Sequence, residues 1–353
     1  MTGISRDTLR IIDANLNRIG EGLRVLEEVA RLSLNDTGLT QQLKDMRHGI
    51  TRVGDEFQLK LINARDANGD VGADMLVAGE AKPRNTKDTI IANARRIQES
   101  LRVLEEIARV PDLKLDTAKY RNARFTLYTV EKELLQKISR QDKLSKLRGL
   151  YVIIDMAMLK GRSYQEVTAQ VILGGAGVIQ LRDKEHGKKE LLAIARDIRD
   201  LCREKDILFI VNDYLDIALA VDADGLHVGP EDLPVATARQ LLTQDKILGG
   251  SARTVNRALA LSADGADYIG VGAMFSTGTK ERAKVVGIKL LGKIKAAVNM
   301  PIVAIGGIKE DNIRDVVRAG ADAVAVISAV LGADDIEKAT RQLVNIIKGE
   351  RDE

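Results

Sequence analysis

The feature that most constrains the fold is an alternation of short apolar runs with amphipathic helical patterns, which begins at Leu150. Eight runs are expected to be strands, at residues 150–154, 177–181, 208–211, 225–228, 247–250, 268–271, 302–305 and 323–327. Helical patterns fill the intervals, for example at residues 188–203, 255–264 and 310–319. Eight strand-then-helix units in about 200 residues predict a (β/α)8 TIM barrel. A doubly wound sheet fits less well, because no Gly-x-Gly-x-x-Gly turn follows the first run.

The residues before the barrel follow a different pattern and are predicted to form an all-α domain with an internal helical repeat. Residues 14–31 match residues 92–109 at 13 of 18 positions. Each copy has four apolar residues spaced as on one helix face. They are Ile19, Leu23, Leu26 and Ala30 in the first copy, and Ile97, Leu101, Leu104 and Ala108 in the second. We therefore expect two domains, residues 1–145 and 148–353. The duplicated unit is expected to serve protein interaction or homo-oligomer formation.

Composition excludes several classes of protein. The balance of 54 basic and 51 acidic residues, with no tryptophan, disfavours nucleic-acid binding. No run approaches the roughly 20 apolar residues of a membrane span, and no signal-peptide core is seen, so a cytoplasmic protein is expected. The single cysteine, Cys202, excludes an internal disulfide and a multi-cysteine metal site.

Glycine and serine after the last two expected strands indicate a phosphate site. Gly306 and Gly307 follow the seventh strand, and Ser328 follows the eighth. In TIM barrels the loops after strands 7 and 8 form the usual phosphate cradle, together with a helix N-terminus. Glycine also lets backbone amides approach phosphate oxygens closely. The alternative is a tight turn without a ligand, and the position after strand seven favours phosphate.

Charged residues after strands two, three and four indicate a diphosphate and a metal. Arg182 and Lys184 alternate along an extended segment, so both lie on one face and can hold a diphosphate together. Asp213 and Asp232 follow the next two strands, and paired carboxylates facing a diphosphate are a common way to hold Mg²⁺. Lys280, in the polar segment after strand six, is expected on a loop that closes over substrate.

Residues 148–348 resemble the thiamine-phosphate synthase family, whose members are transferases with a (β/α)8 fold. The resemblance rests on an ordered set of motifs across the whole second half: Gln180-Leu181-Arg182-Asp183-Lys184, Val211-Asn212-Asp213, Gly225-Leu226-His227-Val228-Gly229, Glu231-Asp232, Gly250-Ser251-Ala252, Thr277-Gly278-Thr279-Lys280, Ile305-Gly306-Gly307-Ile308 and Ile327-Ser328-Ala329. The helical half is similar to an extension found on some family members.

The resemblance implies two small-molecule substrates and one metal. The aminopyrimidine diphosphate would be bound by Gln180, Leu181, Arg182, Asp183, Lys184, Asn212, Ser251 and Lys280. The thiazole phosphate would be bound by Thr277, Gly278, Thr279, Gly307, Ile327 and Ser328. Asp213 and Asp232 would ligate Mg²⁺, and the expected catalytic residues are Arg182, Lys184, Ser251 and Lys280. Pro230 and Arg253 depart from the family pattern, where glutamine and histidine are common.

The implied reaction joins hydroxymethylpyrimidine diphosphate to hydroxyethylthiazole phosphate, giving thiamine phosphate and pyrophosphate. The electron-rich aminopyrimidine stabilises a cation when the bond to diphosphate breaks, so no covalent nucleophile is required. A thiazole tautomerase on the same barrel is the alternative. That isomerase would not need Arg182, Lys184, Asp213 and Asp232 together, which favours the synthase.

Overall fold

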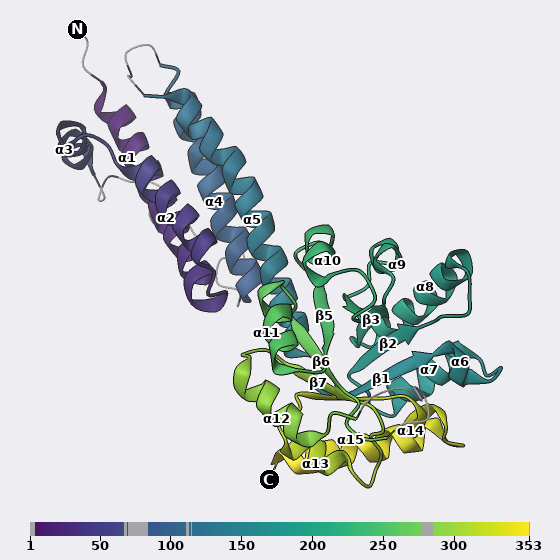
Figure 1. Cartoon of the computed structure of the whole chain (residues 1–353). Coiled ribbons are helices and arrows are strands. Elements are labelled where there is room, and N and C mark those ends of the chain that lie inside the picture. Colours follow the sequence, from purple (N-terminus) through teal and green to yellow (C-terminus); the bar gives the residue numbers. More distant parts are fainter. Residues whose placement is uncertain are drawn as a thin grey trace. The chain divides into compact units, whose positions relative to one another are not determined.

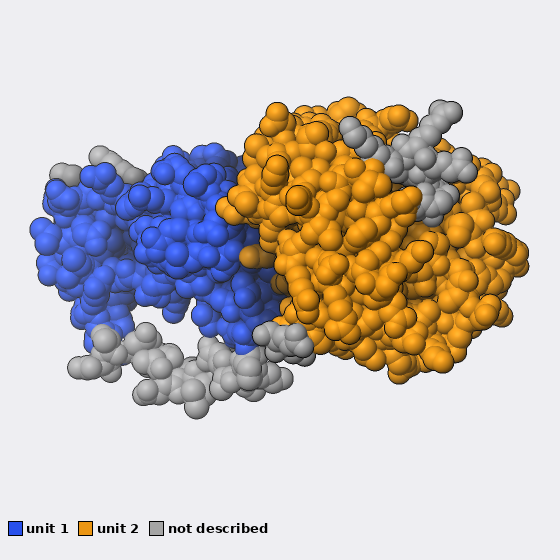
Figure 2. Space-filling model, turned by 60° about the horizontal axis from the view of Figure 1, so that its bottom comes forward, with its two compact units in different colours: residues 1–138 blue, residues 139–353 orange. Residues whose placement is uncertain are grey.

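A computed structural model describes residues 4–66, 69, 84–110, 113, 115–276 and 285–352. Within them the chain forms two compact units, residues 1–138 and residues 139–353, which are coloured separately in Figure 2. The first is helical and the second is a barrel of strands and helices (Figure 1). In the described residues no helix is both long and apolar enough to span a bilayer.

The helical unit consists, in the described residues, of five α-helices and one π-helical turn. Its elements are α1 (Arg6–Glu28), the π-helical turn η1 (Val29–Ser33), α2 (Thr37–Thr51), α3 (Asp55–Ala64), α4 (Thr86–Ile107) and α5 (Thr117–Ser145). Side chains cap several of them: Ser5 accepts a hydrogen bond from the N–H of Thr8, and Asn85 forms a capping box with Asp88. Such caps satisfy backbone donors that a helix leaves unpaired at its start.

The first copy of the repeat lies on α1 and the start of η1, and the second lies on α4 and the two residues that follow it; α1 and α4 pack against each other. All eight predicted stripe residues are buried, so the predicted apolar face of each copy is confirmed. The helices approach closely at Gly22, where a β-carbon would lie 2.6 Å from Cγ1 of Ile97. Only a residue without a side chain fits this crossing unless the neighbour moves. The repeat therefore forms the core of this unit.

Each copy also buries one glutamate at the same position of the repeat. Glu27 accepts hydrogen bonds from Arg24 (2.9 Å) and Arg47 (3.0 Å). Its counterpart Glu105 pairs with Arg102 (3.2 Å) and Arg124 (3.0 Å). Because a buried charge is costly unless it is paired, these arginines keep both carboxylates compatible with the helix interface.

The second unit is a closed barrel of eight parallel strands that pair in chain order, as predicted. The strands are β1 (Gly149–Asp155), β2 (Val178–Arg182), β3 (Leu208–Asn212), β4 (Gly225–Val228), β5 (Ile247–Ala252), β6 (Tyr268–Gly272), β7 (Ile302–Ile305) and β8 (Ala323–Val326). The helices are α6 (Met156–Leu159), α7 (Tyr164–Leu173), α8 (Lys188–Glu204), α9 (Leu215–Ala220), α10 (Val235–Leu241), α11 (Val255–Ala263), α12 (Ile288–Ala297), α13 (Ile313–Arg318), α14 (Ser328–Leu331) and α15 (Ile336–Asp352).

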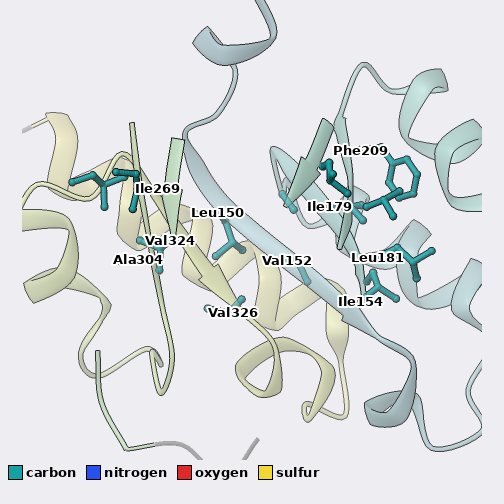
Figure 3. Packing of buried hydrophobic residues seen from close by; sticks show 14 of the residues in the cluster. Leu150, Val152, Ile154, Ile179, Leu181, Phe209, Ile269, Ala304, Val324 and Val326 are labelled. Atoms are coloured by element: carbon teal, nitrogen blue, oxygen red, sulfur yellow. The ribbon is translucent and has the colours of Figure 1, made fainter. Parts of the chain in front are cut away.

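Side chains along each strand alternate between two cores. Leu150, Val152 and Ile154 of β1 belong to the layer between strands and helices, part of which is shown in Figure 3. Tyr151 and Ile153 belong to a smaller cluster inside the barrel. This alternation follows from the two-residue period of an extended chain. It also determines which residues at the carboxyl end of a strand can face the barrel interior.

Residues 139–147 pack with the barrel, ahead of the domain start expected at residue 148. Leu147 is 2% exposed and lies in the cluster inside the barrel. Arg140 pairs with Asp267 (3.6 Å), and Lys143 pairs with Asp224 (3.4 Å). The last turns of α5 thus contribute contacts to the second unit.

Candidate active site

A cavity of about 620 Å³ lies at the carboxyl ends of the barrel strands. All eight strands or the loops that follow them contribute to its lining. Ten residues predicted from the sequence are among those that line it: Gln180, Arg182, Lys184, Asn212, Asp213, Asp232, Ser251, Gly307, Ile327 and Ser328. These residues span almost 150 positions of sequence, and closure of the barrel brings them around one space.

Other residues predicted for the site lie elsewhere. Leu181 is 1% exposed and packs in the layer between strands and helices, because it alternates with Gln180 and Arg182. Asp183 is buried beneath the turn after β2, where it accepts hydrogen bonds from the N–H of Glu185 (2.9 Å) and from Nδ1 of His186 (2.7 Å). Its carboxylate raises the pKa of His186. Thr277, Gly278, Thr279 and Lys280 lie outside the described residues.

Arg182 is held in place by a carboxylate that sequence reasoning missed. Asp155, the last residue of β1, lies beside Arg182 in the strand register and forms an ion pair with it. The Asp155 side chain is only 4% exposed, whereas that of Arg182 is 20% exposed. The pair therefore orients the guanidinium while leaving part of it open to the cavity. In the sequence, Asp155 could have been found as a carboxylate at the end of an apolar strand that neighbours β2.

Lys184, Asp213 and Asp232 form a second charged group on the rim. Nζ of Lys184 lies 3.2 Å from Oδ2 of Asp213, and Asp232 accepts a hydrogen bond from the N–H of Gly229 at 2.8 Å. Burial and a hydrogen bond with Asp232 raise the pKa of Asp213 to about 6. Two crowded carboxyl groups beside a cavity gain from a bound cation, which relieves their repulsion.

Asp213 and Asp232 would need further ligands to hold a metal. Within the described residues no group of three or more His, Cys, Asp or Glu side chains is arranged to bind one. Asp213 and Asp232 alone fit Mg²⁺, which keeps several waters and is commonly shared between one or two carboxylates and substrate phosphates. The donor set therefore fits a metal that arrives with a phosphorylated substrate.

The loop after β7 has the backbone of an anion cradle. Gly306 and Gly307 have φ values of +100° and +68°, in the region that favours glycine. A β-carbon on Gly307 would lie 2.5 Å from the carbonyl oxygen of Ser276, so a side chain does not fit there. Both glycines line the cavity, as does Ser328 at the start of α14. These residues lie together after strands 7 and 8, where a phosphate site was expected, and phosphate binding stays a prediction.

Several further lining residues were not predicted from the sequence. Tyr151, His227 and Tyr268 face the cavity from inside the barrel, and Arg253 and Arg257 line it near α11. No salt bridge to either arginine occurs among the described residues. The two-residue period of the strands places the two tyrosines and the histidine at inward positions, which could have identified them as cavity residues from the sequence.

A closed barrel whose rim combines cations, paired carboxylates and a double glycine around one cavity is typical of TIM-barrel enzymes that act on phosphorylated small molecules. Residues 150–330 match the family model described as thiamine monophosphate synthase. Residues 10–133 match the model described as the ThiD2 family. The chain belongs to the thiamine monophosphate synthase family, and the resemblance inferred from the strand-end motifs is confirmed.

Relatives and a solved structure agree with this assignment. Thiamine-phosphate synthase of a Synechocystis species is 37% identical over 337 residues, which cover 95% of each chain. The protein of the same name from a Synechococcus species is 36% identical over 343 residues, 96% of each chain. Thiamine phosphate pyrophosphorylase from Pyrococcus furiosus is 43% identical, with a TM-score of 0.54, and covers 58% of this chain and 97% of its own.

Proposed function

We propose that this chain joins 4-amino-2-methyl-5-hydroxymethylpyrimidine diphosphate to hydroxyethylthiazole phosphate, forming thiamine phosphate and releasing pyrophosphate. The main support for this proposal is that cations, two carboxylates and two glycines line one cavity in a member of this family. One side of the cavity suits a diphosphate with its metal, and the other suits a single phosphate. An enzyme that only isomerised the thiazole phosphate would not need the side of the cavity that suits a diphosphate with its metal.

The residues near β2 to β4 would stabilise the leaving group. As the bond between the methylene carbon and the diphosphate oxygen breaks, negative charge grows on the diphosphate. The guanidinium of Arg182 and the ammonium of Lys184 are already oriented by Asp155 and Asp213, so they meet this charge without rearranging. Mg²⁺, held by Asp213 and Asp232, would supply Lewis-acid neutralisation of the diphosphate oxygens.

The acceptor would be positioned from the opposite side of the rim. Gly307, Ile327 and Ser328 would hold the thiazole phosphate, so that the thiazole nitrogen attacks the methylene carbon. No covalent intermediate with the protein is needed. In agreement with this, burial raises the pKa of the Cys202 thiol to about 12, so that thiol is not a nucleophile. The roles of Thr277, Gly278, Thr279 and Lys280 remain predictions from the sequence.

Removal of metal tests the proposal directly. Purified full-length protein with both heterocycles and Mg²⁺ should release pyrophosphate and thiamine phosphate in equal amounts. Chelation with EDTA should lower the rate by at least about 100-fold, because several kcal/mol of charge stabilisation are lost. Added Mg²⁺ should restore it. Isomerisation of a thiazole phosphate without pyrophosphate release would contradict the proposal.

We further propose that the helical unit serves protein interaction or homo-oligomer formation. It has its own buried core, separate from the two clusters of the barrel unit. A cytoplasmic location stays a prediction from the sequence, as does the lack of nucleic-acid binding.

Truncation separates the helical unit from catalysis. A chain starting at Ser139 should fold and keep its turnover number, because Arg140, Lys143 and Leu147 remain with the barrel. A chain starting at residue 148 should be less stable by about 2–5 kcal/mol, because it loses the buried Leu147 side chain. Denaturant unfolding and steady-state rates measure both effects. A folded but inactive 139–353 chain would instead assign the helical unit a direct part in the reaction.

A further inference from the structure

Two arginines line the cavity from the side of β5 and α11 without a carboxylate partner. Arg253 directly follows β5, and Arg257 lies in the first turn of α11. Both residues are exposed, and neither forms a salt bridge within the described part of the chain. The other arginine and lysine in the described lining, Arg182 and Lys184, each pair with an aspartate. Arg253 and Arg257, which we call the β5 arginine pair, are therefore available to an anion that enters the cavity.

The backbone between the two arginines is fixed. The hydroxyl of Thr254, the N-cap of α11, accepts a hydrogen bond from the N–H of Arg257 at 3.1 Å. Ala252 and Ala258, on either side of the pair, are 1% and 0% exposed. A capped helix start between buried residues holds the α-carbons of both arginines in place. The β5 arginine pair can therefore meet a ligand at a fixed place on the rim without a change of the backbone.

The order of the strands places this pair beside the proposed metal site. Strands β2, β3, β4 and β5 are consecutive neighbours in the barrel. Arg182 ends β2, and Lys184 follows it. Asp213 follows β3, and Asp232 lies in the loop after β4. The two carboxylates proposed for Mg²⁺ therefore have one pair of cations on the β2 side and the β5 arginine pair on the other.

The β5 arginine pair decides the balance of charge around the cavity. The described lining contains three carboxylates, those of Asp213, Glu231 and Asp232. Its only other arginine and lysine are Arg182 and Lys184, so without the β5 pair carboxylates would outnumber these cations. A rim with an excess of negative charge repels a diphosphate, whereas a rim with an excess of positive charge attracts one. The pair therefore makes the described rim attractive to an anionic substrate.

The two pairs of cations differ in what they can do for the reaction. Arg182 is oriented by the buried carboxylate of Asp155, so it can stabilise charge on a breaking bond without rearranging. Arg253 and Arg257 are exposed and have no such partner among the described residues. Mobile cations attract an anion from a distance, but they must lose rotamer freedom before they can hold it in one geometry. We therefore expect the β5 pair to act on association of the substrate.

We propose that the β5 arginine pair captures the pyrimidine diphosphate at the rim of the cavity and delivers it to Arg182 and Lys184. This rests on the proposed function. A guanidinium is always charged, and its planar fork of N–H donors fits phosphate oxygens. A cleft with an excess of one charge raises the association rate of an oppositely charged ligand by about 10- to 1,000-fold. Loss of the pair should therefore lower kcat/KM for the diphosphate and leave kcat unchanged.

Substituting both arginines by glutamine tests this capture. Arg253→Gln/Arg257→Gln keeps the cap of α11, because Thr254 bonds to a backbone N–H. At an ionic strength of about 0.02 M, kcat/KM for the diphosphate should fall by about tenfold or more, while kcat changes less than about twofold. At about 0.5 M the difference in kcat/KM should shrink to less than about threefold, because salt screens the attraction. An unchanged kcat/KM at low salt, or an equal fall in kcat, would overturn the proposal.

A matched control removes the same charge from another place. Arg196 and Arg203 are exposed on α8, and neither forms a salt bridge among the described residues or lines the cavity. Arg196→Gln/Arg203→Gln should therefore change kcat/KM at low salt by less than about twofold, because charges farther from the cavity are screened. A loss as large as that of Arg253→Gln/Arg257→Gln would assign the effect to net charge and contradict capture by the β5 pair.

Binding of inorganic pyrophosphate provides a test that does not depend on turnover. In the presence of Mg²⁺, ³¹P NMR line shapes give its association and dissociation rates with the full-length protein. In Arg253→Gln/Arg257→Gln the association rate at low salt should fall by about tenfold, while the dissociation rate changes less than about twofold. An unchanged association rate in the folded variant would refute the capture site. If association slows but the unsubstituted protein makes no thiamine phosphate, the proposed function fails and the capture site stands.

Discussion

Asp213→Asn is expected to lower kcat by about 100- to 1,000-fold while the barrel stays folded. Asn keeps the size of Asp213 and tolerates its φ of +66°, so the turn after β3 is preserved. The amide cannot replace the carboxylate charge beside Lys184 and Asp232, however. Loss of one of two proposed Mg²⁺ ligands removes several kcal/mol of charge stabilisation from the breaking bond.

The measurement is steady-state turnover at saturating substrates over a range of Mg²⁺ concentrations, with circular dichroism to confirm folding. Asp216→Asn is the matched control. Asp216 is an exposed aspartate on α9 that pairs with Lys188 outside the cavity. Its loss should change turnover less than about twofold, since exposed ion pairs contribute little. Wild-type-like kcat and Mg²⁺ dependence in Asp213→Asn would exclude this carboxylate as a metal ligand.

Arg182→Ala is expected to lose both activity and stability, for two separate reasons. Turnover should fall by about 100- to 1,000-fold, the usual effect of removing one preorganised donor to a developing negative charge. Stability should fall by about 3 kcal/mol, because Asp155 is left buried without its partner. Arg182→Lys keeps the charge but loses the planar fork, so it should recover only part of the activity.

A second substitution separates these two effects. In Asp155→Asn/Arg182→Ala the buried group is neutral, so most of the lost stability should return while turnover stays low. Urea unfolding gives the stability, and pyrophosphate release gives the rate. If the double variant also regains turnover, Arg182 acts only by supporting the fold, and its proposed role at the diphosphate is wrong.

Local sequence was enough to predict the barrel because the two-residue period of strands and the turn residues between them are short-range properties. All eight strands lie within about two residues of their predicted limits. The same period distinguishes Gln180 and Arg182, which line the cavity, from Leu181, which packs outward. The resemblance had grouped all three by their place in one motif.

Partners that are far apart in sequence could not be predicted in this way. Asp155 lies 27 residues from Arg182, and Tyr151 lies 117 residues from Tyr268. No local pattern pairs them, because their contact depends on which strands are neighbours and on where each strand ends. The same reason explains Leu147, which precedes the first strand yet belongs to the interior of the barrel.

Side-chain types and their period along the chain were enough to predict the class of fold and the apolar face of the duplicated helices, and they indicated residues suited to a diphosphate, a metal and a phosphate. How these residues are held depends on the closed barrel: Arg182 pairs with Asp155, Lys184 pairs with Asp213, and Gln180 donates a hydrogen bond to Tyr151. Side-chain chemistry and period are local properties of the chain, whereas these ion pairs and hydrogen bonds form only when closure of the barrel brings distant strands together.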